Sequence, residues 1–412
     1  MTVRVNIWSD DHSFPINCEG KLPPAAEVFA LHREWKTQYN TGNYGENFQT
    51  VRGDFSEQKS RGSGAKVKLL KLLKQIYKWL EQITSLLLQD YQGINYHPTQ
   101  GEAHSYPEGN SKIPYRIKIN KNQTTNFSIK DLTTSAQQLE TSFNNWLKSD
   151  FFQPIEEKMR CNFKKEDAVR VVIQTNNDLL WRMPWHCWDL LKDYPKAEVA
   201  FSGPNSDRIV KVSARNKLRV LAILGDSTGL DLNADKETLK SLPAEVEILE
   251  QPTREKCDRY LGDEQGWDIL CFSGHSYSEA DSSKGFIHIN SEETLTIPDL
   301  KDVLSGAIAR NLHLAIFNSC DGLGLARQLA DLHLPQMIVM REPVPDRVAQ
   351  EFLQSFLRYY ANGTSLYVSV REARKDLQSI EGNFPCASWL PVIWQNQAEI
   401  PQNWETFSDS RN

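Results

Sequence analysis

The sequence predicts an α/β fold in which a mostly parallel, doubly wound sheet is flanked by helices and preceded by a mainly helical N-terminal region. Three observations predict it. From Ala168 onward, short apolar runs of strand length alternate with segments of helical periodicity. One run, 218–224, is apolar at almost every position, which is typical of parallel strands buried on both faces. Before Ala168 the periodicity is mainly helical, and the sequence between the helical segments is polar.

The N-terminal region has two predicted helices. Apolar residues recur at spacings of three and four over 69–87 and again over 129–146, so each segment should form an amphipathic helix. We interpret both apolar stripes as faces that pack into a helical core; a docking or oligomerisation surface is the alternative. Residues 1 to about 65 are polar and we expect them to be irregular, whereas 114–119 alternates like a strand with one solvated face.

The remaining elements follow in a regular order. Right-handed crossovers between strand–helix–strand units would place their strands in one sheet. The predicted order is strand 169–173, strand 218–224, helix 235–241, strand 246–249, helix 253–261, strand 267–272, hairpin strand 285–289, helix 298–309, strand 312–317, helix 323–332, strand 336–340 and two C-terminal helices.

Composition limits the function classes. The 412 residues are enough for two or three domains, and 40% hydrophobic residues describe an ordinary soluble protein. The formal net charge of −6 gives no electrostatic case for nucleic acid or an anionic membrane as a partner. No apolar run reaches the roughly 18 to 20 residues that a membrane helix needs.

The cysteine pattern indicates reduced thiols. The seven cysteines are widely spaced, odd in number and never arranged as C-x-x-C, so we expect neither a disulfide framework nor a zinc site. The N-terminus has no apolar signal region, which favours a cytoplasmic protein. We expect no metal and no cofactor.

A histidine and a cysteine stand at the ends of two predicted strands. The strand 267–272 ends at Ser273-Gly274-His275, and the strand 312–317 ends shortly before Cys320. Ligands of open α/β sheets bind at the carboxyl ends of strands, and one crossover helix separates these two, so they can be neighbours. Thiol catalysis needs an imidazole that the fold brings to the thiol. We therefore predict Cys320 as the nucleophile and His275 as the general base and acid.

The surroundings of Cys320 would assist this chemistry. The predicted helix 323–332 begins just after it, and the partial positive charge of a helix N-terminus favours the thiolate. Backbone N–H groups of Gly274, Ser276 and Cys320 are candidate oxyanion donors. One such donor is typically worth about 3 to 4 kcal/mol of transition-state stabilisation.

Five motifs carry a family resemblance. They are Phe-Ser-Gly-His at 272–275, Asn-Ser-Cys-Asp-Gly at 318–322, Leu-Trp-Arg-Met-Pro-Trp at 180–185, Asn-Gly-Thr-Ser-Leu at 362–366 leading into 370–374, and the segment 388–394, which matches the family's closing strand. Together, in this order, they resemble the CHAT domains, caspase-like cysteine peptidases of the caspase/separase group. One departure stands out: the family usually has glycine directly after the histidine, where this chain has Ser276.

The resemblance implies a caspase-like fold and hydrolysis of peptide bonds in protein substrates by His275 and Cys320. It also implies a stress, immunity or cell-death type pathway and an activating or sensor partner. We accordingly expect a CHAT domain over 128–398 with its core sheet at 215–395, and a tail over 399–412. Residues 1–127 would form a regulatory or partner-recruiting module, although the tetratricopeptide repeats common in such proteins are not visible there.

The resemblance also suggests a substrate pocket. In this group it is lined by the loop after the first core strand and by residues near the cysteine, which here are Asp226, Asn318, Asp321 and Arg341. If Asp226 points into the pocket, Arg or Lys before the scissile bond would be favoured. The alternative is a solvated loop carboxylate or helix cap.

Two rival functions are considered. The segment 225–229 fits G-x-S-x-G, which would make Ser227 the nucleophile of a serine esterase, but no helix follows directly as that elbow requires. The stronger rival is a catalytically silent interaction scaffold that keeps the same fold, and Ser276 gives it some support. His186 lies in an aromatic cluster, so we expect it to be a packed histidine.

Overall fold

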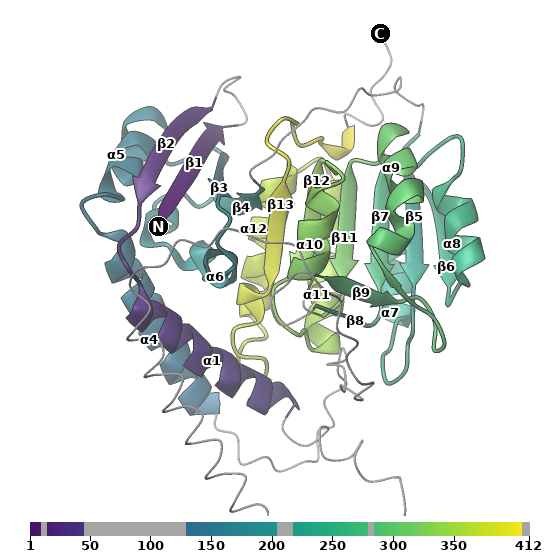
Figure 1. The fold of residues 1–412 in the computed structure, drawn as a ribbon, viewed down its shortest axis with the longest axis horizontal. Helices are drawn as coiled ribbons and strands as arrows, with labels where there is room; N and C mark the ends of the chain where they lie inside the picture. Colours follow the sequence, from purple (N-terminus) through teal and green to yellow (C-terminus); the bar gives the residue numbers. More distant parts are fainter. Residues whose placement is uncertain (10–14, 45–128, 204–216, 279–283, 321, 406–412) are drawn as a thin grey trace, which may run out of the picture. The chain divides into compact units, whose positions relative to one another are not determined.

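The computed structural model describes residues 1–9, 15–44, 129–203, 217–278, 284–320 and 322–405 (Figure 1). The predicted helix over 69–87 and the predicted strand over 114–119 lie outside these residues. No helix among the described residues is long and apolar enough to span a membrane.

A ten-stranded sheet forms the core, with strand order β2-β1-β3-β4-β13-β12-β11-β7-β5-β6. Six of its nine pairings are parallel and three are antiparallel. This confirms the predicted fold class. Its strands are β1 (Thr2–Ser9), β2 (Ile16–Lys21), β3 (Val169–Gln174), β4 (Glu198–Ser202), β5 (Arg219–Leu224), β6 (Glu245–Glu250), β7 (Ile269–Ser273), β11 (Leu314–Asn318), β12 (Gln336–Met340) and β13 (Pro391–Gln395).

Eight strands of the sheet form two parallel groups that run in opposite directions. Strands β12, β11, β7, β5 and β6 are parallel to one another, and so are β13, β4 and β3. The two groups meet where β12 and β13 pair antiparallel, with Met340 opposite Pro391. The carboxyl ends of β12, β11, β7 and β5 therefore lie at one edge, together with the start of β13.

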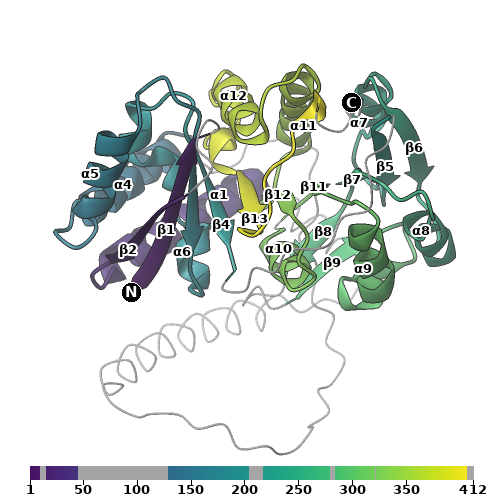
Figure 2. The same cartoon turned by 90° about the horizontal axis from the view of Figure 1, so that it is seen from above.

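Helices cover both faces of the sheet. Figure 2 shows α7, α11 and α12 on one face and α9 and α10 on the other. The helices are α1 (Ala26–Tyr44), α4 (Ile129–Leu147), α5 (Gln153–Asn162), α6 (Asp178–Arg182), α7 (Asn233–Lys240), α8 (Arg254–Leu261), α9 (Lys301–Ala309), α10 (Leu323–Ala330), α11 (Asp346–Ala361) and α12 (Leu366–Gln378), with 3₁₀ turns η1 (Trp185–Cys187), η2 (Asp189–Lys192), η3 (Pro298–Leu300) and η4 (Ala387–Trp389).

Local sequence explains the helices that carry most of the packing. On α11, Phe352, Phe356 and Tyr360 recur every four residues and are fully buried, which gives the helix one continuous apolar face. Pro345 precedes α11, where the missing N–H of a proline costs nothing. On α12, Arg374 reaches buried Glu198 of β4 at 2.9 Å, so the ion pair fixes this helix to the sheet.

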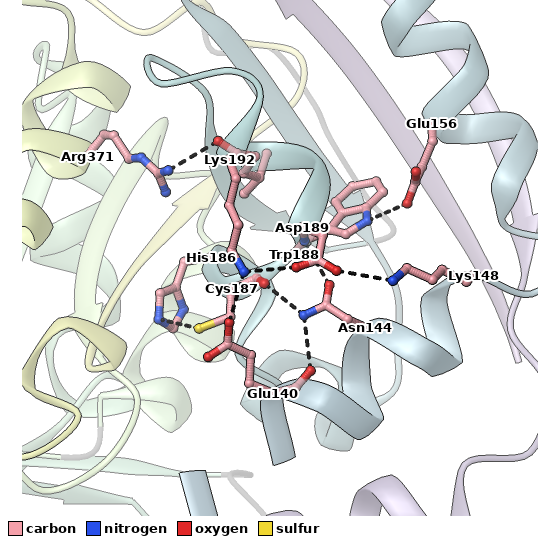
Figure 3. A network of polar contacts seen from close by, with 11 residues as sticks. Glu140, Asn144, Lys148, Glu156, His186, Cys187, Trp188, Asp189, Lys192 and Arg371 are labelled. Atoms are coloured by element: carbon pink, nitrogen blue, oxygen red, sulfur yellow. Dashed lines mark hydrogen bonds and ion pairs between the residues drawn. The ribbon is translucent and has the colours of Figure 1, made fainter. Parts of the chain in front are cut away.

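Helix α4 confirms the predicted helix over 129–146, and its stripe Leu132, Leu139 and Phe143 is buried. A polar network joins it to the segment 185–192 (Figure 3). Asn144 donates to the carbonyl of Cys187 at 3.0 Å and accepts from the N–H of Asp189 at 2.7 Å. The docking-surface alternative for this stripe is therefore wrong, because the stripe belongs to the core.

Three strands of the sheet were not predicted. Residues 1–44, expected to be irregular, form β1, β2 and α1, and β1 joins the sheet by pairing antiparallel with β3. The third is β4. A separate three-stranded sheet follows β7 and consists of β8 (Ser276–Ser278), β9 (Gly285–His288) and β10 (Thr294–Thr296).

Candidate functional site

His275 and Cys320 occupy equivalent positions on neighbouring strands. Strands β7 and β11 pair in parallel, and their last partners are Ser273 and Asn318. His275 and Cys320 each lie two residues beyond that pair, so the register brings both to the same edge of the sheet. Both are buried, with exposed fractions of 1% and 0%.

A glycine allows the chain to turn into His275. Gly274 has φ +153°, a conformation that residues with a side chain rarely adopt. A Cβ on Gly274 would stand 3.2 Å from Cα of Gly225, in the loop after β5. A Cβ on Gly225 would in turn collide with the carbonyl oxygen of His288. The loops after β5 and β7 thus lie against each other at two glycines.

The loop after β5 orients the imidazole. Nε2 of His275 lies 2.9 Å from the carbonyl oxygen of Thr228. A carbonyl can only accept, so Nε2 carries the hydrogen, and Nδ1 is the nitrogen that can take up a proton. The G-x-S-x-G segment therefore contributes a backbone acceptor to the site. Ser227 itself accepts from Gln251 at 3.0 Å, and α7 starts only at Asn233, so the segment does not form a nucleophile elbow.

The thiol of Cys320 is enclosed by the segment that follows β12. The N–H of Val344 points at Sγ from 3.4 Å, and the carbonyl of Val344 is 3.8 Å away. An N–H aimed at sulfur favours the thiolate. Val344 and Cys320 are both fully buried, so Sγ is covered in this structure and Val344 contributes to the cover.

Ser276 connects the loops of the two residues. Its hydroxyl is hydrogen-bonded to the hydroxyl of Ser319 at 2.7 Å and also donates to the carbonyl of Cys320. Its backbone belongs to β8, where the N–H of His288 donates to His275 at 2.9 Å and the next pair is Ser276 with Ile287. Hydrogen-bonded and open pairs alternate in antiparallel ladders, so the N–H of Ser276 points away from β9.

The predicted pocket residues have different surroundings. The carboxylate of Asp226 accepts from the N–H and hydroxyl of Thr228 at 3.0 and 2.7 Å, as a loop cap does. Asn318 is fully buried and donates to Asp235 at 3.4 Å. Arg341 donates to the carbonyls of Arg182 and Met183. Asp321 lies outside the described residues.

Burial lowers the pKa of Arg341. Desolvation, with the nearby cation of Arg374, lowers the pKa of Arg341 to about 9. Arg341 is 2% exposed and its guanidinium donates to backbone carbonyls, which suits a group that fixes the end of β12 to the turn after α6.

Sequence reasoning missed two acidic residues at this edge. Asp235 at the start of α7 is 1% exposed and holds Asn318; Asp346 at the start of α11 is 7% exposed. Asp346 accepts from the backbone N–H of Asp231 at 3.3 Å and from Gln350 at 3.0 Å. Both follow the carboxyl ends of parallel strands, which was the signal that could have found them.

Helix α1 packs on the segment 341–345. Tyr39 donates to the carbonyl of Pro343 at 2.9 Å, and Lys36 forms a 2.7 Å ion pair with Glu342. Glu342 also pairs with Arg182 at 3.1 Å. Burial opposes ionisation of Glu342, but the cations of Lys36 and Arg182 hold its pKa below the ordinary value.

His186 and Cys187 form a histidine–cysteine contact elsewhere in the fold, and its electrostatics differ from those of a catalytic pair. Nε2 of His186 lies 3.2 Å from Sγ of Cys187 (Figure 3). Burial lowers the pKa of His186 and raises that of Cys187, so both groups are held neutral. The ring of His186 also packs edge-on against Trp389, which agrees with the predicted packed histidine. The described residues contain no cluster of three or more side chains that could hold a metal.

The chain matches one family model, described as CHAT domain, over residues 141–408, which is more than half of its length. Among curated proteins there is no match. Among solved structures, separase of Saccharomyces cerevisiae in complex with securin is similar at 13% identity and a TM-score of 0.34, covering 52% of this chain and 14% of that chain. This chain thus spans a small part of the separase chain.

Two further solved structures show similarity at the same level. The Arg-specific cysteine proteinase gingipain R is 9% identical with a TM-score of 0.34, covering 50% of this chain and 56% of that chain. Caspase-1 from Spodoptera frugiperda is 12% identical with a TM-score of 0.30, covering 48% of this chain and 98% of that chain.

Proposed function

Because the chain belongs to the CHAT domain family, we propose that it is a cysteine endopeptidase that cleaves proteins through Cys320 and His275. One observation carries the proposal: the two residues lie at equivalent positions beyond Ser273 and Asn318 on paired strands. The hydrogen bond from His275 to Thr228 supports it, since it leaves Nδ1 as the proton acceptor.

The reaction follows from these groups. Nδ1 of His275 takes the proton of the Cys320 thiol, and the thiolate attacks the carbonyl carbon of the scissile bond. The N–H groups of Ser276 and Cys320 donate hydrogen bonds to the developing oxyanion, with Gly274 as the third candidate donor. The imidazolium then protonates the leaving amine. Water, deprotonated by His275, cleaves the thioester and restores the thiol.

The proposed substrates carry Arg or Lys before the scissile bond. Asp235 supports this preference because its buried carboxylate holds Asn318, two residues before Cys320. Asp346 adds a second carboxylate at the same edge. Asp226 remains a candidate, although its carboxylate already accepts two hydrogen bonds from Thr228. A guanidinium or ammonium group complements such a site in charge.

A catalytically silent scaffold is the second candidate, and one observation favours it. Cys320 is fully buried, and the backbone N–H of Val344 donates a hydrogen bond to its sulfur. Under the peptidase proposal this is a covered state, in which the segment 341–345 must be displaced before substrate binds. Under the scaffold proposal the cover is permanent. The stress, immunity or cell-death setting and the regulatory role of residues 1–127 stay predictions.

Mapping of new protein N-termini in cells separates the two candidates. Cells expressing the full chain should contain cleavage products that are absent from cells expressing Cys320→Ala or His275→Ala. Cys187→Ala is the matched control, because its thiol also lies beside an imidazole but has a raised pKa, and its products should equal those of the wild type. The same products in wild type and Cys320→Ala would leave only the scaffold.

A further inference from the structure

The backbone pairing between β7 and β11 ends before the two proposed reacting residues. The ladder between β7 and β11 ends at Ser273 and Asn318, and His275 and Cys320 lie beyond it. Their relative position is therefore set by contacts between the two loops. Ser276 makes one such contact, directly beside both residues.

Ser276 is anchored independently of the cysteine loop. It follows His275 directly, and its backbone pairs with Ile287 in β8 and β9. From this fixed position its hydroxyl reaches the hydroxyl of Ser319 and the carbonyl of Cys320. Ser276 and Ser319 are both fully buried, so water does not compete for these bonds.

The two bonds lie on either side of the Cα of Cys320. One holds the preceding residue, Ser319, and the other holds the carbonyl of Cys320 itself. Together they restrict the backbone rotations that set where the Cα–Cβ bond of Cys320 points. The direction of that bond determines whether Sγ can reach the imidazole.

We propose that Ser276 is a positioning residue: its hydroxyl fixes the Cys320 turn relative to His275, so that thiol and imidazole act as a pair. The proposal rests on the proposed function of that pair. It also gives the departure from the family's usual glycine a role, because glycine has no side chain that could hold the carbonyl of Cys320. The serine would thus supply a restraint that this chain needs.

The test compares two neighbouring buried hydroxyls. Ser276→Ala and Ser276→Gly remove the link, whereas Ser273→Ala removes a fully buried hydroxyl that has no hydrogen-bond partner among the residues the structure describes. Each full-length variant is alkylated with iodoacetamide between about pH 5 and pH 9, and the rate at Cys320 is measured by mass spectrometry. Hydrolysis of an Arg-containing peptide gives kcat and KM.

We expect Ser276→Ala and Ser276→Gly to abolish the His275-dependent part of the alkylation profile. They should lower kcat by about 10- to 100-fold, the loss expected from a misplacement near 1 Å, with little change in KM. Ser273→Ala should behave as wild type. Ser276→Thr keeps the hydroxyl and should retain the wild-type profile, which guards against a variant that simply fails to fold.

A wild-type alkylation profile in Ser276→Ala would overturn the proposal, and so would equal losses in Ser276→Ala and Ser273→Ala. Failure of the proposed function has a different signature: His275→Ala would then leave the alkylation profile of Cys320 unchanged. In a His275→Ala background, removal of the Ser276 hydroxyl should cause no further change in the pH dependence, because Ser276 acts through the pair.

Discussion

The phenolic hydroxyl of Tyr39 donates to the carbonyl of Pro343, one residue before the amide that holds the Cys320 thiol. Tyr39 belongs to α1, which lies outside the segment 141–408 matched by the family model. A helix from the N-terminal region is therefore hydrogen-bonded to the segment 341–345, which covers the proposed nucleophile.

Weakening the contact of α1 should expose the thiol. Tyr39→Phe removes one hydrogen bond, worth about 1 kcal/mol, and this corresponds to about a five-fold larger population in which 341–345 is displaced. We expect the alkylation rate of Cys320 to rise by about that factor. Lys36→Met, which breaks the ion pair with Glu342, should act in the same direction.

Arg33→Met is the control for α1, since it removes a positive charge from an exposed position of the same helix. It should leave the alkylation rate of Cys320 unchanged. A slower or unchanged rate in both Tyr39→Phe and Lys36→Met would contradict a covering role for the helix.

His32 on α1 should make stability depend on pH. Burial lowers the pKa of His32 from 6.5 to about 4, with Glu342, Lys36, Arg182 and Arg341 as the charged groups around it. Below pH 6.5 the unfolded chain binds a proton at His32 that the folded chain does not. The contribution of the neutral His32 to the free energy of unfolding is therefore complete above pH 6.5 and is lost as pH falls toward 4. The loss amounts to about 3 kcal/mol.

Urea unfolding of wild type and His32→Gln at several pH values between about 7.5 and 4.5 measures this effect. The variant should lose less stability over this range than the wild type. Some dependence should remain, because burial also lowers the pKa of His186. Parallel curves for the two proteins would show that His32 does not titrate as described.

Substrate preference should depend on Asp235 more than on Asp226. Asp235→Asn removes the buried charge beside Asn318, and we expect kcat/KM for peptides with Arg or Lys before the cut to fall by about 10- to 100-fold. Asp226→Ala should have a smaller effect, because its carboxylate serves Thr228. A peptide library that shows the same basic preference in Asp235→Asn as in wild type would remove Asp235 from the pocket.

Gly274 should tolerate no side chain. At φ +153°, a Cβ would meet the backbone of Gly225, so Gly274→Ala should lower the free energy of unfolding by about 1 to 3 kcal/mol and displace His275. Gly382 is the matched control, because a Cβ there meets nothing within 4 Å. Thermal unfolding of the two alanine variants measures the difference, and equal melting temperatures would argue against strain at Gly274.

The buried strands β5 and β12 could be predicted from the sequence, whereas the edge strand β2 could not. Strands buried on both faces, such as β5 and β12, consist of continuous apolar runs that a sequence shows directly. The edge strand β2 has the sequence Ile-Asn-Cys-Glu-Gly-Lys and exists because it pairs with β1. Such a strand carries little signal of its own, since tertiary pairing decides its conformation.

The candidate site divides in the same way. His275 and Cys320 were predicted because side chains at strand ends are visible in a sequence. The acceptor at Thr228 and the donor at Val344 are backbone groups, which every residue has, so only the folded chain identifies them. Asp346 is in the first turn of a long amphipathic helix, where acidic residues are common, so the sequence alone does not single it out.

The antiparallel junction of β12 and β13 has a mechanical consequence. It places the turn before β13 next to the end of β12, where the N–H of Arg341 donates to Leu390 at 2.9 Å. The ring of Trp389 in that turn packs in a tilted arrangement against Trp35 of α1, with ring centroids 5.2 Å apart. Three hydrogen bonds thus help to hold the segment 341–345. Pro343 accepts from Tyr39 of α1, Val344 donates to Sγ of Cys320, and Arg341 donates to Leu390 before β13. A displacement of α1 or of the turn before β13 should therefore also move the N–H of Val344 that donates to Sγ.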